Sequence, residues 1–210
     1  MTIRQFEESN TKKYEIEKLE EKLKDLIVKA NSGDSEAQFY LGKFYSADNI
    51  KQGDSKAEQY FGKYYNPKYI KPNYSEAFKW YKQSAEQGYV RAQNNLGFMY
   101  LNGLGVKQDY VEAFKWYKKS AEQGSVIAQF NLGFMYENGK GITQDYSEAF
   151  KWYKQSAEQG NVEAQLALGF MYENGHGVAK DFSEAMKWYR KSAEQGNARS
   201  QVILFDKLTI

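Results

Sequence analysis

The stretch SEAFKWYKQSAEQG, residues 147–160, recurs almost unchanged along the chain. Copies begin at Ser75, Val111 and Ser183, so consecutive copies start 36 residues apart. The tryptophans of the chain keep this register: Trp80, Trp116, Trp152 and Trp188. A fixed period of roughly 20–50 residues is typical of stacked repeats, because a single repeat cannot bury its apolar face alone. The stretch therefore predicts an architecture of repeated units.

The same stretch has the pattern of an amphipathic α-helix. At 100° per residue, one stripe of the first copy carries Ala77, Trp80, Tyr81, Ser84 and Ala85. Lys, Gln and Glu fill the opposite stripe in every copy, which predicts a solvated face. A binding box for a ligand is the alternative function of the Trp-Tyr pairs. Their place beside small alanines favours core packing instead.

Another helix and a glycine-rich loop precede this stretch in three regular units. The helix contains Leu-Gly-Phe-Met-Tyr, and the loop reads Asn-Gly-x-Gly-Val/Ile, with a glycine that can end the helix in the left-handed conformation. An aspartate three residues before a glutamate then starts the second helix, at Asp109, Asp145 and Asp181. We therefore expect residues 75–196 to form a regular array of antiparallel helix hairpins, and the fold class to be all-α.

Both ends of the chain have features of caps. Residues 1–11 are polar and aperiodic, so we expect an irregular tail, followed by a helix from Lys12 to Ala30. Residues 1–32 would then cap the array, although pairing of this helix with a second chain is an open alternative. At the other end, residues 197–210 form a capping helix, in which Phe205 takes the position of the glycine and covers the open end.

Residues 33–74 contain a shorter duplication. Residues 33–45 resemble residues 53–65, and the second copy has nearly the regular spacing to Ser75. We therefore interpret the first copy as the extra or truncated unit, within a degenerate segment.

Composition excludes several classes of protein. The chain has 210 residues, a net charge of +2 and charges of alternating sign, which argues against nucleic acid as a partner. No apolar run is long enough to span a membrane, and the first residues lack the apolar segment of a secretory signal. Cysteine is absent, which fits a reducing compartment. We expect a cytoplasmic protein, or alternatively an effector exported without a cleavable signal peptide.

Taken together, the motifs resemble a known family. Ala-x-x-x-Leu-Gly-x-x-Tyr, then Asn-Gly-x-Gly-Val, then Ala-x-x-Trp-Tyr-x-x-Ser/Ala-Ala-x-x-Gly is similar to the Sel1-like repeat (SLR), a relative of the tetratricopeptide repeat. The resemblance covers residues 75–210 strongly and 33–74 weakly. It implies a right-handed α-solenoid that acts as an adaptor, with effectors, immunity proteins and signalling regulators among its bacterial members. A cysteine-rich branch linked to penicillin binding differs, because this chain has no cysteine.

Nothing in the sequence favours catalysis. Polar residues repeat with the period, as in a scaffold, whereas an active site needs convergent groups that differ from one another. His176 stands where the sister loops have Leu104 and Lys140, so we interpret it as a solvated loop residue without a metal. The glycine-rich loops lack the Lys-Ser/Thr of a phosphate-binding loop. We expect no enzyme activity, no cofactor and no metal.

The first helices of the hairpins offer a better candidate site. In stacked hairpins these helices line the concave surface, and here one face diverges between repeats while the rest is nearly identical. Phe98, Phe134 and Phe170 would form an aromatic ladder on this face, unless each ring packs on the next repeat. The residues that we expect to contact a partner are Arg91, Asn94, Asn95, Phe98, Ile127, Phe130, Asn131, Phe134, Glu163, Leu166 and Phe170.

The sequence therefore predicts a non-catalytic scaffold that binds a protein or peptide, as a monomer, on the concave face. Two other classes stay open. One is a hydrolase-type enzyme with a site on a single repeat, and the other is a structural oligomer joined through the N-terminal helix. Light scattering would separate the oligomer from a monomeric adaptor.

Overall fold

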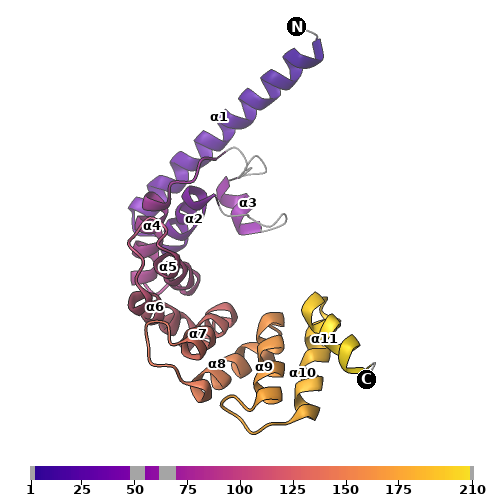
Figure 1. Ribbon diagram of the computed structural model, residues 1–210. Helices are drawn as coiled ribbons and strands as arrows, with labels where there is room; N and C mark the ends of the chain where they lie inside the picture. The colour runs from indigo at the N-terminus through magenta and orange to yellow at the C-terminus, as the bar shows by residue number, and fades with distance from the viewer. Residues whose placement is uncertain (1–2, 48–54, 62–69, 209–210) are drawn as a thin grey trace. The chain divides into compact units, whose positions relative to one another are not determined.

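The computed structural model describes residues 3–47, 55–61 and 70–208, and its regular structure in these ranges is entirely helical (Figure 1). The chain divides into two compact units, residues 1–107 and residues 108–210. The N-terminal unit contains α1 (Ile3–Asn31), α2 (Ser35–Ser46), α3 (Ser55–Phe61), α4 (Tyr74–Glu86) and α5 (Val90–Asn102). The C-terminal unit contains α6 (Tyr110–Glu122), α7 (Val126–Asn138), α8 (Tyr146–Glu158), α9 (Val162–Asn174), α10 (Phe182–Glu194) and α11 (Ala198–Leu208).

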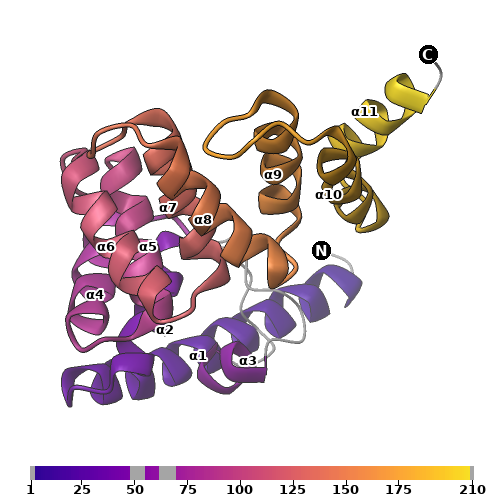
Figure 2. The same cartoon turned by 90° about the horizontal axis from the view of Figure 1, so that it is seen from below.

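Successive helices pair as antiparallel hairpins, which is clear from the polar contacts between α7 and α8. The Ser156 hydroxyl, late in α8, donates to the carbonyl oxygen of Val126 at the start of α7, at 2.7 Å. One turn away, Gln159 Nε2 donates to Gln129 Oε1 at 2.7 Å. Because buried polar groups are costly when they are unpaired, these two hydrogen bonds fix the register of α7 and α8. The same pair of contacts joins α9 and α10, which lie side by side in both views (Figures 1 and 2).

Glycine and tyrosine set the separation within each hairpin. A Cβ atom on Gly133 would lie 2.7 Å from the Tyr153 ring, and one on Gly169 would lie 2.3 Å from the Tyr189 ring. Both tyrosines are completely buried. The Leu-Gly motif is therefore needed because the ring of the second helix lies directly on the backbone of the first. The neighbouring Trp152, which the sequence also placed in the core, is only half-buried.

The start of α1 differs from the expected one. The helix begins at Ile3, so the prediction of an irregular segment over residues 1–11 is wrong. Residues 3–31 contain neither glycine nor proline, and nothing in them interrupts helical hydrogen bonding. Near the other end of α1, Leu26 and Ala30 are buried, and the Ala30 carbonyl oxygen accepts a hydrogen bond from Gln38 Nε2 of α2.

The duplicated segment also pairs differently from the expectation. Gly42 of α2 faces the Tyr81 ring of α4, where a Cβ atom would lie 2.5 Å from the ring. Ser84 of α4 donates to the carbonyl oxygen of Ser35, at 2.6 Å. The first copy is thus the partner of α4, and the interpretation of it as the extra unit is wrong. The physical reason is burial, because α2 contributes three large buried side chains, Phe39, Tyr40 and Leu41, while α3 is a short inserted helix. Residues 62–65 of the second copy lie outside the described residues.

The last helix, α11, packs on α10. The buried Ser200 hydroxyl donates to Ser192 Oγ of α10, at 2.9 Å, and Ile203 and Leu204 pack against the cluster around Leu166. Phe205 is 69% exposed. The expectation that Phe205 covers the end of the array is therefore wrong, since the two residues before it, Ile203 and Leu204, pack against the core instead.

Candidate functional site

A pocket of about 400 Å³ lies in the C-terminal unit. It is formed by α7, α8, α9, the loop after α9 and the first turn of α11. We call it the α7–α9 pocket, and its lining residues are Phe130, Phe134, Glu137, Tyr153, Glu163, Leu166, Ala167, Phe170, Asn174, His176 and Arg199. Three phenylalanine rings and one tyrosine give it mostly aromatic walls, and two carboxylates and one guanidinium group give it charged edges.

Phe134 and Phe170 occupy equivalent positions on α7 and α9, and each ring has a cation above it. Lys140 Nζ lies 5.1 Å from the centre of the Phe134 ring, and the Arg199 guanidinium carbon lies 4.8 Å from the centre of the Phe170 ring. Such contacts are attractive because the face of an aromatic ring is electronegative. The rings are only half-buried, so each keeps surface that a second molecule can contact.

Glu137, at the end of α7, accepts a hydrogen bond from a buried tyrosine. The Tyr153 hydroxyl donates to Glu137 Oε2 at 2.7 Å. Burial, and then the nearby carboxylate, raise the pKa of Tyr153, so the phenol stays protonated and remains a donor. One wall of the pocket is thereby joined to the core of the hairpin.

In the next repeat, Glu173 takes the same position and has two partners. It accepts hydrogen bonds from Tyr189, at 2.6 Å, and from Lys207 of α11. Burial raises the pKa of Glu173, but the hydrogen bonds from Lys207 and Tyr189 outweigh burial and leave the pKa lowered. Glu173 is therefore satisfied within the chain, whereas Glu137 has Tyr153 as its partner and lines the pocket.

Glu163 lies in the first turn of α9 at the rim of the pocket. Its Oε1 atom accepts a hydrogen bond from Asn197 Nδ2, at 2.9 Å. In the part of the chain that the structure describes, its Oε2 atom has no hydrogen-bond or ion-pair partner. The carboxylate is exposed and is thus available to a cation from outside.

His176 follows α9 in the loop and lines the same pocket. Its ring stacks on the Tyr146 ring with the centres 4.6 Å apart. The side chain is exposed, as expected for a loop residue, but its place in the lining of the pocket was not expected. The sister loops carry Leu104 and Lys140 at this position, so the feature differs from repeat to repeat.

The structure brings together five of the residues expected to contact a partner, namely Phe130, Phe134, Glu163, Leu166 and Phe170. Ile127 and Asn131 are also on α7, outside the lining of the pocket. The other four, Arg91, Asn94, Asn95 and Phe98, are on α5 in the N-terminal unit, where Phe98 is 49% exposed. Glu137 and Arg199 also line the pocket but were not among the expected contacts, although both stand at positions that diverge between repeats.

The described residues contain no group of His, Cys, Asp or Glu arranged to hold a metal ion. A search of the same residues for a helix long and apolar enough to cross a membrane found none. The chemistry that the pocket offers is aromatic contact, one open carboxylate oxygen and one guanidinium group, and these are means of binding a side chain.

The 36-residue unit can now be compared with known proteins. The model of the Sel1 repeat matches residues 35–63, 62–89, 90–125, 126–161 and 162–197. The chain belongs to the Sel1 repeat family. The structure gives a different division near the N-terminus, since α2 pairs with α4 across the boundary between the first two matches. A comparison with proteins of curated function gave no match.

Solved structures of Sel1 repeat proteins agree with the fold. A protective antigen present in uropathogenic Escherichia coli strains, which displays an SLR fold, is 38% identical over 85% of this chain, with a TM-score of 0.72. A Sel1 repeat protein from Oxalobacter formigenes is 34% identical over 82%, with a TM-score of 0.67. The cysteine rich protein B of Helicobacter pylori is 27% identical over 62% of this chain and is itself covered over 97%, with a TM-score of 0.50. The chain spans 34% of the first protein and 63% of the second.

The α-solenoid class and the family predicted from the repeated motifs are thereby confirmed. All three organisms are bacteria, which agrees with the bacterial members that the family resemblance implies. Sel1 repeat proteins are generally scaffolds for protein interactions and are typically without enzyme activity.

Proposed function

We propose that this chain is a non-catalytic scaffold that binds a protein or peptide through the α7–α9 pocket. The observation that supports the proposal most strongly is the pocket itself, which gathers Phe130, Phe134 and Phe170 from two consecutive repeats around one space. Exposed aromatic rings in a hollow are common anchors for partner proteins. The described residues contain no group of side chains arranged to hold a catalytic metal ion.

Composition supports a protein partner in a reducing compartment. The near balance of positive and negative residues, with a net charge of +2, provides no basic surface for a nucleic acid. The absence of cysteine agrees with action in the cytoplasm. The partner would lie across α7 and α9, and it could contact side chains of two repeats at once.

We expect Phe134→Ala and Phe170→Ala each to weaken binding of the partner by about 1–3 kcal/mol, because aromatic anchors dominate interfaces of this kind. A partner isolated by pull-down and identified by mass spectrometry would be titrated into each variant in a calorimeter. Phe182→Ala is the matched control, since Phe182 is exposed on α10 and does not line the pocket. Unchanged affinity in both pocket variants would contradict the proposal and direct attention to the loops around Leu104, Lys140 and His176.

A second candidate function is self-association through α1. Tyr14 and Ile16 of this helix are 52% and 50% exposed. The N-terminal part of α1 extends beyond α2 (Figure 1). We nevertheless expect light scattering to give the mass of one chain, 24.4 kDa, because a short apolar seam rarely holds a helix pair together. A measured mass of two chains would favour the structural oligomer, provided that the Ile16→Glu variant has the mass of one chain. The neighbouring Glu17→Gln variant is the control and should keep the mass of two chains.

A further inference from the structure

Two helices of the chain, α2 and α9, correspond residue by residue. In each, a glycine meets the buried tyrosine of the second helix: Gly42 meets Tyr81, and Gly169 meets Tyr189. This common contact fixes the register between them. Glu36 of α2 then corresponds to Glu163 of α9, and Tyr40 corresponds to Ala167. Glu163 and Ala167 both line the pocket. The contacts that Glu36 and Tyr40 make on α2 therefore indicate which contacts a ligand of the pocket could make.

The helix that follows each of these hairpins has matching residues as well. In the N-terminal unit, the Tyr89 hydroxyl donates to Glu36 Oε1 at 3.4 Å. In the C-terminal unit, Asn197 Nδ2 donates to Glu163 Oε1 at 2.9 Å. Two residues later stands an arginine in both cases, Arg91 and Arg199. The glutamate, its donor and the arginine are therefore built twice in the molecule.

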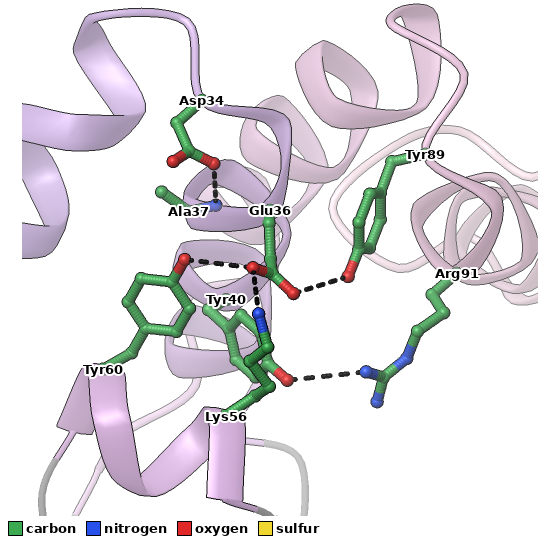
Figure 3. Close-up of polar contacts among 8 residues, drawn as sticks. All are labelled: Asp34, Glu36, Ala37, Tyr40, Lys56, Tyr60, Tyr89 and Arg91. Carbon is green, nitrogen blue, oxygen red and sulfur yellow. Dashed lines mark hydrogen bonds and ion pairs between the residues drawn. The ribbon is translucent and has the colours of Figure 1, made fainter.

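The two sites differ in the partners of the second carboxylate oxygen, Oε2 of Glu36 and Oε2 of Glu163. In the N-terminal unit the inserted helix α3 lies on α2, where Lys56 Nζ is 2.9 Å from Glu36 Oε2 (Figure 3). The Tyr60 hydroxyl donates to the same oxygen at 3.3 Å, and its ring lies 4.8 Å from the Tyr40 ring, centre to centre. The hydrogen bond to Glu36 raises the pKa of Lys56, which keeps this lysine charged.

The C-terminal unit, which the structure describes without a gap from 108 to 208, has no helix that corresponds to α3. Glu163 Oε2 consequently has no partner in the described chain. Position 167 is alanine where α2 has a tyrosine, and a small side chain leaves open the space that Tyr40 fills. The α7–α9 pocket thus corresponds to the place where α3 lies on α2, and no helix of the described residues fills it.

We propose that the α7–α9 pocket binds a helical segment of a partner protein that carries a lysine and, four residues later, a tyrosine. The lysine ammonium group pairs with Glu163 Oε2, and the tyrosine ring enters the space above Ala167, between Phe130, Phe134 and Phe170. This proposal rests on the proposed function and specifies the chemistry of the partner.

The spacing follows from helix geometry, because residues four apart lie on one face of an α-helix, as Lys56 and Tyr60 do in α3. Charge agrees with this occupant. Glu137 and Glu163 give the pocket two carboxylates, while its one guanidinium group, that of Arg199, lies over the Phe170 ring. A basic side chain therefore fits the open position better than an acidic one, and an aromatic side chain fits the volume of about 400 Å³.

The probe is a synthetic, helix-constrained peptide with the sequence of residues 53–62, labelled with a fluorophore and titrated against the full chain by fluorescence anisotropy. We expect it to bind, and we expect peptides with Lys56→Glu or Tyr60→Ala to bind at least about tenfold more weakly, a difference of about 1.4 kcal/mol. The Glu163→Lys chain should bind the original peptide at least about tenfold more weakly and should bind the Lys56→Glu peptide more tightly than the unchanged chain does. Glu194→Lys, an equal change of charge on the exposed end of α10, is the matched control.

Circular dichroism would verify that both variants fold. Equal binding of all three peptides, or loss of affinity without recovery on charge reversal, would overturn the lysine–tyrosine assignment. A natural partner that depends on Phe170 but not on Glu163 would overturn this inference and leave the proposed function standing. A partner indifferent to both residues would overturn both. Dimerisation of the chain that Glu163→Lys abolishes would identify the occupant as α3 of a second copy, and would overturn the assignment to another protein.

Discussion

Replacing Tyr153 by alanine is expected to lower the free energy of unfolding by about 3–5 kcal/mol, the usual cost of truncating a large buried aromatic side chain. Tyr153 is 1% exposed and contacts the backbone of α7 at Gly133, so no neighbouring side chain can easily fill the cavity. Urea unfolding followed by circular dichroism would measure the loss. The adjacent Lys154 is exposed, and its replacement by alanine should be nearly silent.

Tyr153→Phe separates packing from hydrogen bonding at the same site. It keeps the ring and removes the hydroxyl that donates to Glu137, and a hydrogen bond to a charged group contributes about 1.5–3 kcal/mol. We therefore expect a smaller loss than for alanine. Trp152→Ala should also cost less than Tyr153→Ala, because Trp152 is half-buried. An order in which Trp152→Ala is the more damaging change would show that tryptophan, not tyrosine, is the main core residue of the helix.

The sequence predicted the hairpins well because their determinants are local and repeat. Asp145 accepts hydrogen bonds from the amides of Ser147 and Glu148 at the start of α8, as its place before a glutamate indicated. Gly139 ends α7 with a positive φ of 64°. The relative burial of Trp152 and Tyr153 could not be predicted in the same way. The two residues are neighbours on one stripe, and a rotation of the helix by a few tens of degrees decides which of them faces the core.

The pairing of α2 with α4 shows a different limit of sequence reasoning. The spacing to Ser75 favoured the second copy, residues 53–65, as the helix that pairs with α4, because the interpretation rested on the period of the repeats alone. In the structure, the partner of α4 is the helix that buries Phe39, Tyr40 and Leu41, and the chain between them accommodates α3 as an insertion. Loop length costs little free energy compared with the burial of three large side chains.

The composition of the pocket depends on contacts between repeats. Position 163 was expected to face a partner because it diverges among repeats, and it lines the pocket. Arg199 stands at the same diverging position one period after Glu163, but it follows the regular array in a segment interpreted as a cap, so a place over the Phe170 ring was not expected. His176 was judged by its own loop alone, yet the neighbour on which it stacks, Tyr146, is thirty residues earlier in the chain.

The second glycine of the Asn-Gly-x-Gly loop has a role that the sequence did not explain. Gly177 has a φ of 70°, and a Cβ atom on it would lie 2.1 Å from the carbonyl oxygen of Tyr146. The loop after α9 thus passes directly over the backbone at the start of α8. Only a residue without a side chain permits this approach, which also positions His176 on the Tyr146 ring.

Gly177→Ala is therefore expected to lower the free energy of unfolding by about 2–5 kcal/mol. The left-handed backbone costs alanine about 1–2 kcal/mol, and forcing an atom into closely packed backbone costs about 1–3 kcal/mol more. Gly160→Ala is the matched control, since Gly160 also has a positive φ, 92°, but no atom lies within 4 Å of the added Cβ. It should show the first cost alone in urea unfolding. Equal losses in the two variants would mean that the loop yields easily, and that the close approach to Tyr146 does not hold His176 in the wall of the pocket.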